Sequence, residues 1–171
     1  MTAPGPVACP RRLCWNRGEM PEEAARRYPE RPVVGVGAVV LDSGRVLLVE
    51  RGREPMKGAW SLPGGALRTG EQLADGLRRE LREETGLEVR ILEVVEVFER
   101  ILKDAQGRIE YHYVLIDYLC EKMGGHLRPG DDVSRAEWVE RDRLGEYRIT
   151  EGTLAVIAKG FAVRDRPGLS I

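Results

Sequence analysis

The sequence predicts an α/β fold, either a general α+β arrangement or a three-layer α/β/α sandwich. Two observations lead to this prediction. Apolar, β-branched segments occupy most of the chain between residues 33 and 140, and a strongly amphipathic helical segment at 70–85 interrupts them. A second helical pattern at 150–163 closes the chain. Strands and a few helices bury their apolar faces by packing as layers around one core.

The 171 residues suit one domain with a sizeable core. Residues 1–31, with five prolines and no apolar periodicity, are expected to form a flexible lead-in to a domain at 32–165, and 166–171 a tail. The formal net charge of −1 argues against a general nucleic-acid or membrane-surface binder. No apolar run has the length of a membrane span or the position of a signal peptide, so we expect a soluble cytoplasmic protein.

Cysteine usage argues against a disulfide framework, because the three residues Cys9, Cys14 and Cys120 are an odd number. Cys9 and Cys14 lack the further ligands that a zinc site needs. Cys120 ends an apolar strand and is expected to pack as a small hydrophobe.

The first predicted strand covers 33–41, and a turn at 42–44 leads to a second strand at 45–50, which together form a hairpin. Gly35 and Gly37 alternate on one face of the first strand. They allow either close core packing, which we favour, or the close approach of backbone or a ligand.

The segment 51–63 is a loop rich in glycine and proline that carries the cations Arg51, Arg53 and Lys57. Such a loop is either a solvated surface or, because it leads directly into the amphipathic helix, a binding site for substrate phosphates. Trp60 belongs either to the core or to a surface that stacks on a base.

The amphipathic helix has marked ends. Thr69 and Gln72 have the spacing of a capping box, and Gly86 is a usual stop. Leu73, Leu77 and Leu81 define its apolar stripe.

Three carboxylates converge at the end of this helix, because Glu80, Glu83 and Glu84 lie on neighbouring positions of the helical wheel. A charge run is usually a solvated face, but Glu84 falls inside the apolar stripe. Grouped anions at a partly desolvated position need a counter-charge. Arg79 can pair with Glu83, yet one arginine cannot neutralise three glutamates. Magnesium or manganese accepts such oxygen ligands, so the helix predicts a metal site.

The stretch 65–87, GALRTGEQLADGLRRELREETGL, resembles the Nudix box of the Nudix hydrolases at every position of that motif. The matching residues are Gly65, Glu71, Arg79, Glu80, Leu81, Glu83, Glu84, Gly86 and Leu87. The resemblance implies an α/β/α sandwich with a mixed sheet. It also implies an enzyme that hydrolyses a diphosphate linkage in a nucleoside diphosphate joined to another group.

The resemblance further implies site roles. Glu80, Glu83 and Glu84 would hold one to three Mg²⁺ ions together with the Gly64 carbonyl, Mn²⁺ being an alternative. Glu83 or Glu84 would accept the proton of water, and Arg79 would orient a glutamate. The partner would be a small-molecule nucleotide, with no nucleic acid or membrane involved and a homodimer left open.

Beyond the helix, strands at 88–100 and 108–120 are joined by a hairpin turn at 104–107. A polar loop at 124–134 follows. In proteins that resemble this one, an acidic residue outside the box often supplies another ligand or the base, and the candidates are Asp132 and Asp131, with Glu137 behind them.

A short strand at 136–140, a helical turn at 141–147 and a helix at 150–163 complete the chain. The last helix should bury Leu154, Ile157, Ala158 and Phe161 on one face.

Substrate choice depends on the resemblance alone. ADP-ribose-like compounds are favoured, although the downstream proline that often marks that subgroup is missing at 101–103. A nucleoside triphosphate pyrophosphatase of the MutT-like, pool-cleaning type is the alternative. A Nudix-fold sensor that binds a nucleotide without cleaving it is a third, and all box glutamates are present here.

Overall fold

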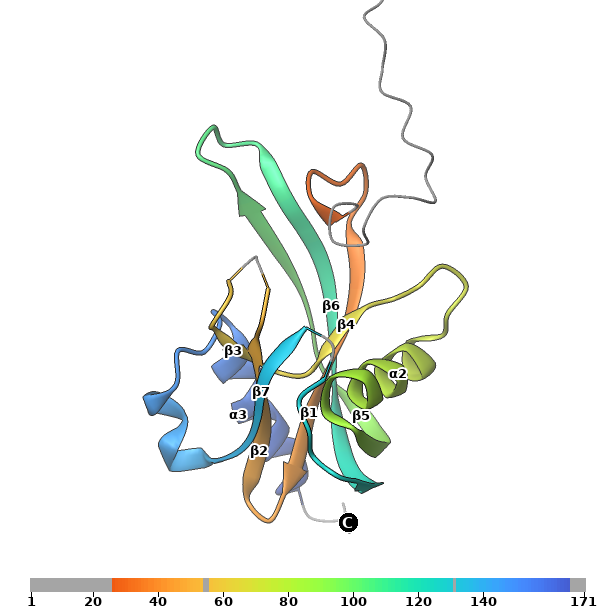
Figure 1. Ribbon diagram of the computed structural model, residues 1–171, viewed down its shortest axis with the longest axis vertical. Helices are drawn as coiled ribbons and strands as arrows, with labels where there is room; N and C mark the ends of the chain where they lie inside the picture. The colour runs from red at the N-terminus through yellow and green to blue at the C-terminus, as the bar shows by residue number, and fades with distance from the viewer. Residues whose placement is uncertain (1–25, 54–55, 131, 167–171) are drawn as a thin grey trace, which may run out of the picture.

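The computed structural model describes residues 26–53, 56–130 and 132–166, and it confirms the predicted fold class. In this part of the chain, strands form one sheet and two α-helices cover its opposite faces (Figure 1). The elements are β1 (Val33–Asp42), β2 (Arg45–Arg51), β3 (Trp60–Ser61), β4 (Gly64–Ala66), α2 (Leu73–Thr85), β5 (Leu87–Lys103), β6 (Ile109–Gly125), β7 (Val133–Glu140), the 3₁₀ helix η1 (Arg141–Glu146) and α3 (Thr153–Arg164).

The sheet is mixed, with the strand order β3-β2-β1-β6-β5. Strands β1 and β6 run parallel, whereas β4 pairs with β1 and β7 with β2 in antiparallel fashion. Both predicted hairpins are present, β1–β2 and the long β5–β6 arm that extends beyond the rest of the sheet in Figure 1. β6 continues past Cys120 because residues 121–125 still pair with β5 at 87–90.

Alternate residues of β1 build two cores on the two faces of the sheet. Ala38 and Val40 pack with Leu77 and Leu81 of α2. Val39 and Leu41 pack on the other side with the buried residues of α3. This period of two is what a strand buried on both faces requires.

Trp60 belongs to the second of these cores and is 6% exposed. Its ring meets that of Tyr147 edge-on, with 5.0 Å between the centroids. Cys120 is also buried, and burial raises the pKa of its thiol to about 12. The core interpretations of both residues are therefore confirmed.

The predicted start of the central helix is wrong, whereas its end is confirmed. α2 begins at Leu73, and Gln72 precedes it without a side-chain capping hydrogen bond. The backbone N–H of Arg68 instead donates to the Glu71 carboxylate at 3.0 Å, so the residues before the helix form a turn. At the other end, Gly86 adopts the left-handed conformation of a helix stop, with φ of 69°.

The predicted face of the last helix is only half right. Ile157 and Phe161 are buried, but Leu154 and Ala158 are exposed. Val156, Gly160 and Val163 are buried instead, and Gly160 packs directly against Val39 of β1.

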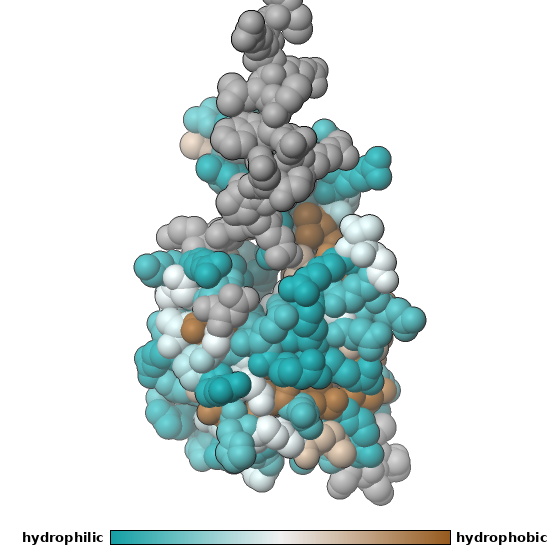
Figure 2. Space-filling model, turned by 45° about the vertical axis from the view of Figure 1, so that its right-hand side comes forward, coloured by the Kyte–Doolittle hydropathy of each residue, from teal (hydrophilic) through white to brown (hydrophobic). Residues whose placement is uncertain are grey.

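Some of the remaining predictions fall on described residues and others fall outside them. The helical turn after β7 is present as η1. Cys9, Cys14, Asp131 and most of the lead-in lie outside the described residues. Among the described helices, none is long and apolar enough to cross a membrane, and the face seen in Figure 2 is mostly hydrophilic.

Candidate functional site

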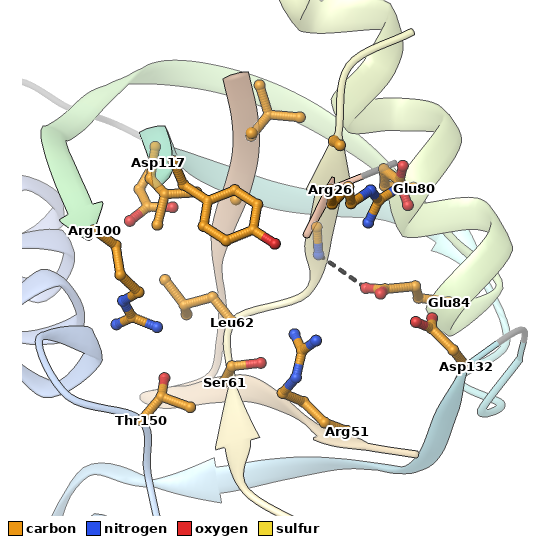
Figure 3. A pocket seen from close by; sticks show the side chains of 18 of the residues that line it. Arg26, Arg51, Ser61, Leu62, Glu80, Glu84, Arg100, Asp117, Asp132 and Thr150 are labelled. Atoms are coloured by element: carbon orange, nitrogen blue, oxygen red, sulfur yellow. Dashed lines mark hydrogen bonds between the residues drawn. The ribbon is translucent and has the colours of Figure 1, made fainter. Parts of the chain in front are cut away.

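A cavity of about 260 Å³ opens between α2, the glycines of β1 and β4, and the long strands β5 and β6. Figure 3 shows its two ends. Glu80, Glu84 and Asp132 line one end, with Arg51 reaching toward Glu84. Asp117 and Arg100 line the other end.

Arg79 organises the carboxylates around the middle of α2. Its guanidinium donates to Glu71 at 2.7 and 2.8 Å, to Glu80 at 2.7 Å and to Glu83 at 3.0 Å. A further bond reaches the Ala66 carbonyl oxygen at 3.3 Å. The pairing predicted between Arg79 and Glu83 is therefore present. The side chains of Arg79 and Glu71 are only 15% and 16% exposed, so this network is largely shielded from water.

Glu84 lies apart from this network and is 8% exposed. Its carboxylate accepts a hydrogen bond from the Gly64 N–H at 2.8 Å. Burial, together with the charges of the nearby Glu80 and Asp132 carboxylates, raises the pKa of Glu84 to about 8.

Gly64 must be glycine to hold this position. Its φ is +144°, and a Cβ atom there would lie 2.1 Å from the Val36 carbonyl oxygen. The close pairing of β1 with β4 therefore depends on Gly64, and that pairing aims its N–H at Glu84.

The three box glutamates do not converge on one point as the sequence predicted. Across the described ranges, no group of three or more His, Cys, Asp or Glu side chains is arranged to hold a metal ion. The reason is that Glu83 is exposed and turns toward Arg79 and Arg68, whereas the Glu84 carboxylate points toward the Gly64 N–H. Helical spacing places the three Cα atoms on one side but does not fix their rotamers.

The donor chemistry still fits a hard divalent cation. Burial raises the pKa values of both Glu80 and Glu84, so each carboxylate lacks the solvation that its charged form needs. Both line the same cavity as Asp132, and all three offer carboxylate oxygen, which Mg²⁺ and Mn²⁺ prefer. Of these three carboxylates, Arg79 pairs only with Glu80, and a bound cation would supply a counter-charge to Glu84 and Asp132 as well.

The predicted phosphate-binding cations are separated by the structure. Arg51 and Arg53 line the cavity, and Arg51 lowers the pKa of Glu84 through its charge. Lys57 is exposed and is not among the lining residues. Arg26 and Arg68, which sequence reasoning missed, line the same end of the cavity.

Of the predicted additional acids, Asp132 lines the cavity beside Glu84. Glu137, the reserve candidate, does not line it. It accepts a hydrogen bond from the Tyr147 hydroxyl at 3.0 Å and pairs with Arg135, so it acts in the packing of β7.

The far end of the cavity was missed by sequence reasoning. β6 presents Tyr111, Tyr113, Leu115 and Asp117 at alternate positions on one face, and all four line the cavity. The available signal was an aspartate between the apolar residues Ile116 and Tyr118 of β6. Its position opposite the end lined by Glu80 and Glu84 became visible only when β6 paired with β1.

Comparison with known proteins gives a consistent result. The family model described as NUDIX domain matches residues 31–159. The "ADP-ribose pyrophosphatase" of Methanocaldococcus jannaschii is 32% identical over 113 residues, which are 66% of this chain and 64% of the relative. A "MutT-like protein" of Streptomyces ambofaciens is 30% identical over 126 residues, 74% of each chain.

A solved structure agrees with these sequence relationships. The MutT NUDIX hydrolase of Burkholderia pseudomallei superposes with a TM-score of 0.67 and 30% identity, covering 76% of this chain and 98% of that one. The chain described here spans just under two thirds of the length of the archaeal relative.

Proposed function

Because the chain belongs to the NUDIX domain family, we propose that it hydrolyses a diphosphate linkage in a nucleoside diphosphate joined to a second group, in a magnesium-dependent reaction. One observation carries the proposal. Two buried carboxylates with raised pKa values, Glu80 and Glu84, line the same cavity as Arg51 and Arg53. A polyanionic substrate needs cations of both kinds, from arginines and from bound metal.

Each group has a defined part in this reaction. Glu80, Glu84 and the Gly64 carbonyl would hold Mg²⁺, with Glu83 joining them once its side chain turns from Arg79. The ion neutralises phosphate charge and lowers the pKa of water when bound. Arg79 fixes the Glu80 carboxylate with a 2.7 Å hydrogen bond.

Arg51 and Arg53 would bind the diphosphate through charge-assisted hydrogen bonds. A carboxylate at the cavity must then take the proton of the attacking water. Glu83, Glu84 and Asp132 are the candidates, and among them Glu84 and Asp132 lie beside each other in Figure 3.

ADP-ribose-like compounds are the favoured substrates, and the relative from Methanocaldococcus jannaschii that bears the name ADP-ribose pyrophosphatase supports this choice. A nucleoside triphosphate pyrophosphatase activity of MutT-like type is the second candidate. The Streptomyces relative and the Burkholderia structure, both MutT by name, support that alternative.

The test is product analysis after incubation of the full chain with Mg²⁺ and ADP-ribose, dinucleoside polyphosphates, NADH or nucleoside triphosphates. Glu83→Gln and Glu84→Gln should lower kcat by orders of magnitude with unchanged circular dichroism. Glu88→Gln is the matched control, because Glu88 is exposed on β5 and does not line the cavity. Nucleotide binding without product would identify a sensor, and near-normal turnover in both site variants would contradict the assigned carboxylates.

A further inference from the structure

The end of the cavity away from the glutamates contains a buried carboxylate that the proposed hydrolysis does not use. Asp117 is 6% exposed, yet it lines the cavity. Within the described part of the chain, its carboxylate has no hydrogen-bond or salt-bridge partner, although the charge of Arg100 acts on it. A buried acceptor without a partner is costly and marks a place where a ligand can donate.

The backbone makes room for this carboxylate. Asp117 stands opposite Gly37 in the parallel register of β1 and β6. A Cβ atom on Gly37 would lie 2.1 Å from the Asp117 Oδ1 atom, so the carboxylate occupies the space that a side chain at 37 would fill. Gly37 thus makes room for the Asp117 side chain, whereas the sequence had suggested core packing or the approach of backbone or a ligand.

The neighbouring wall suits a flat ring. Leu115 and Tyr113 precede Asp117 on the same face of β6, and Phe98 of β5 stands opposite Leu115. Nucleobases are held by such apolar and aromatic walls combined with a few polar groups aimed at the ring edge. A sugar alone, which presents hydroxyls all round, would leave these apolar atoms unmatched.

We propose that Asp117 accepts a hydrogen bond from the exocyclic amino group of a nucleobase, adenine N6 or cytosine N4, while the phosphates lie at the Glu84 end. This inference rests on the proposed function, because it places the nucleoside half of the substrate in the second half of the cavity. It adds a specificity-determining residue outside the Nudix box.

The choice of an amino group follows from the hydrogen-bonding groups of the carboxylate and of the base. An ionised carboxylate only accepts hydrogen bonds. Asp117 is only 6% exposed and lies at the end of the cavity away from the glutamates, so we expect it to meet the edge of the base that is remote from the sugar and the phosphates. At C6 of a purine or C4 of a pyrimidine, the group on that edge is an amino donor in adenine and cytosine but a carbonyl acceptor in hypoxanthine and uracil.

Arg100 complements Asp117 at the same end of the cavity. Its guanidinium donates to the Glu151 carbonyl oxygen, which anchors the side chain. The other N–H groups of Arg100 can donate to a ring nitrogen, which is the acceptor beside the amino group in both adenine and cytosine. Asp117 and Arg100 together would therefore bind a base edge that has an amino donor next to a ring-nitrogen acceptor.

The experiment compares matched nucleotides that differ at that position. Binding of AMP and IMP, and of CMP and UMP, is measured by calorimetry with the full chain and Mg²⁺. We expect AMP and CMP to bind about 5- to 150-fold more tightly than their oxo counterparts, the range of one good base contact. Asp117→Asn should abolish or reverse both ratios, because its carboxamide can donate to a carbonyl. Asp75→Asn, on the exposed face of α2, is the control and should leave the ratios unchanged.

Each outcome either supports or contradicts the base contact of Asp117. Equal binding of AMP and IMP by the wild-type chain would overturn the inference, even if the Asp117 variant failed to fold. An equal loss for all four nucleotides in Asp117→Asn would also overturn it, because a ribose contact predicts that result. Selective binding of AMP without hydrolysis of any diphosphate would support the subsite and contradict the proposed function. Hydrolysis with equal binding of the amino and oxo nucleotides would support the proposed function and contradict the subsite.

Discussion

Replacing Arg79 by alanine tests whether this one side chain holds the acidic cluster together. The guanidinium makes four short hydrogen bonds to the carboxylates of Glu71, Glu80 and Glu83 and a longer one to the Ala66 carbonyl. It is 15% exposed, so water compensates little for its loss. The variant would leave three neighbouring carboxylates without their shared cation.

The expected cost follows from that geometry. Removing one partner of a buried charge network costs about 3–5 kcal/mol, because the remaining charges stay desolvated. Glu83 is partly exposed, which places the effect at the lower end, about 3 kcal/mol. For a chain of this length, that corresponds to a fall in Tm on the order of 10 °C.

The assay is thermal and urea unfolding of the full chain in EDTA, because a bound cation would neutralise the same glutamates and mask the loss. Arg78→Ala is the matched control. Arg78 is the preceding residue of α2 and is exposed, and among the described residues it pairs only with Asp75, at 3.2 Å. Its loss should therefore cost less than about 0.5 kcal/mol. A cost below about 1 kcal/mol for Arg79→Ala would refute the reasoning that Arg79 holds the cluster.

Further predictions concern the cavity and the core. Burial raises the pKa of Asp117 from 3.8 to about 6, so its ionisation destabilises the fold above pH 6, and the penalty disappears below about pH 4. Asp117→Asn should therefore be more stable by up to about 3 kcal/mol in urea at pH 7.5, with a gain that shrinks toward pH 4; a gain independent of pH would contradict this. Gly64→Ala should lower the free energy of unfolding more than Gly58→Ala in the same assay. Both glycines have positive φ, but only at Gly64 would the added Cβ atom collide with a neighbouring carbonyl oxygen, and equal losses would contradict that close contact. The Cys120 thiol, with its raised pKa and 1% exposure, should react with a thiol reagent only on unfolding when the other two cysteines are serine, and rapid labelling of the native chain would place it at the surface.

Local patterns in the sequence determined the elements. The alternation in β1, the two hairpin turns and the stop at Gly86 are short-range features, and each is present in the structure. The Nudix-box spacing likewise identified Arg79 and the glutamates, because a motif of this length lies on one loop and one helix. The start of α2 was predicted wrongly because the capping box expected from Thr69 and Gln72 does not form. Glu71 accepts hydrogen bonds from the Arg68 N–H and the Arg79 guanidinium, which hold the residues before Leu73 in a turn.

Tertiary structure decided how these groups combine. Which glutamate turns to Arg79 and which to Gly64 depends on the pairing of β1 with β4. Asp117 meets Gly37 only because β6 runs parallel to β1 and brings together residues 80 positions apart in the chain. Side-chain spacing along one helix or strand is fixed by backbone geometry, whereas register between distant strands results from the packing of the whole sheet. The sequence therefore determined the family and the acidic end of the cavity, and the sheet decided what lies opposite.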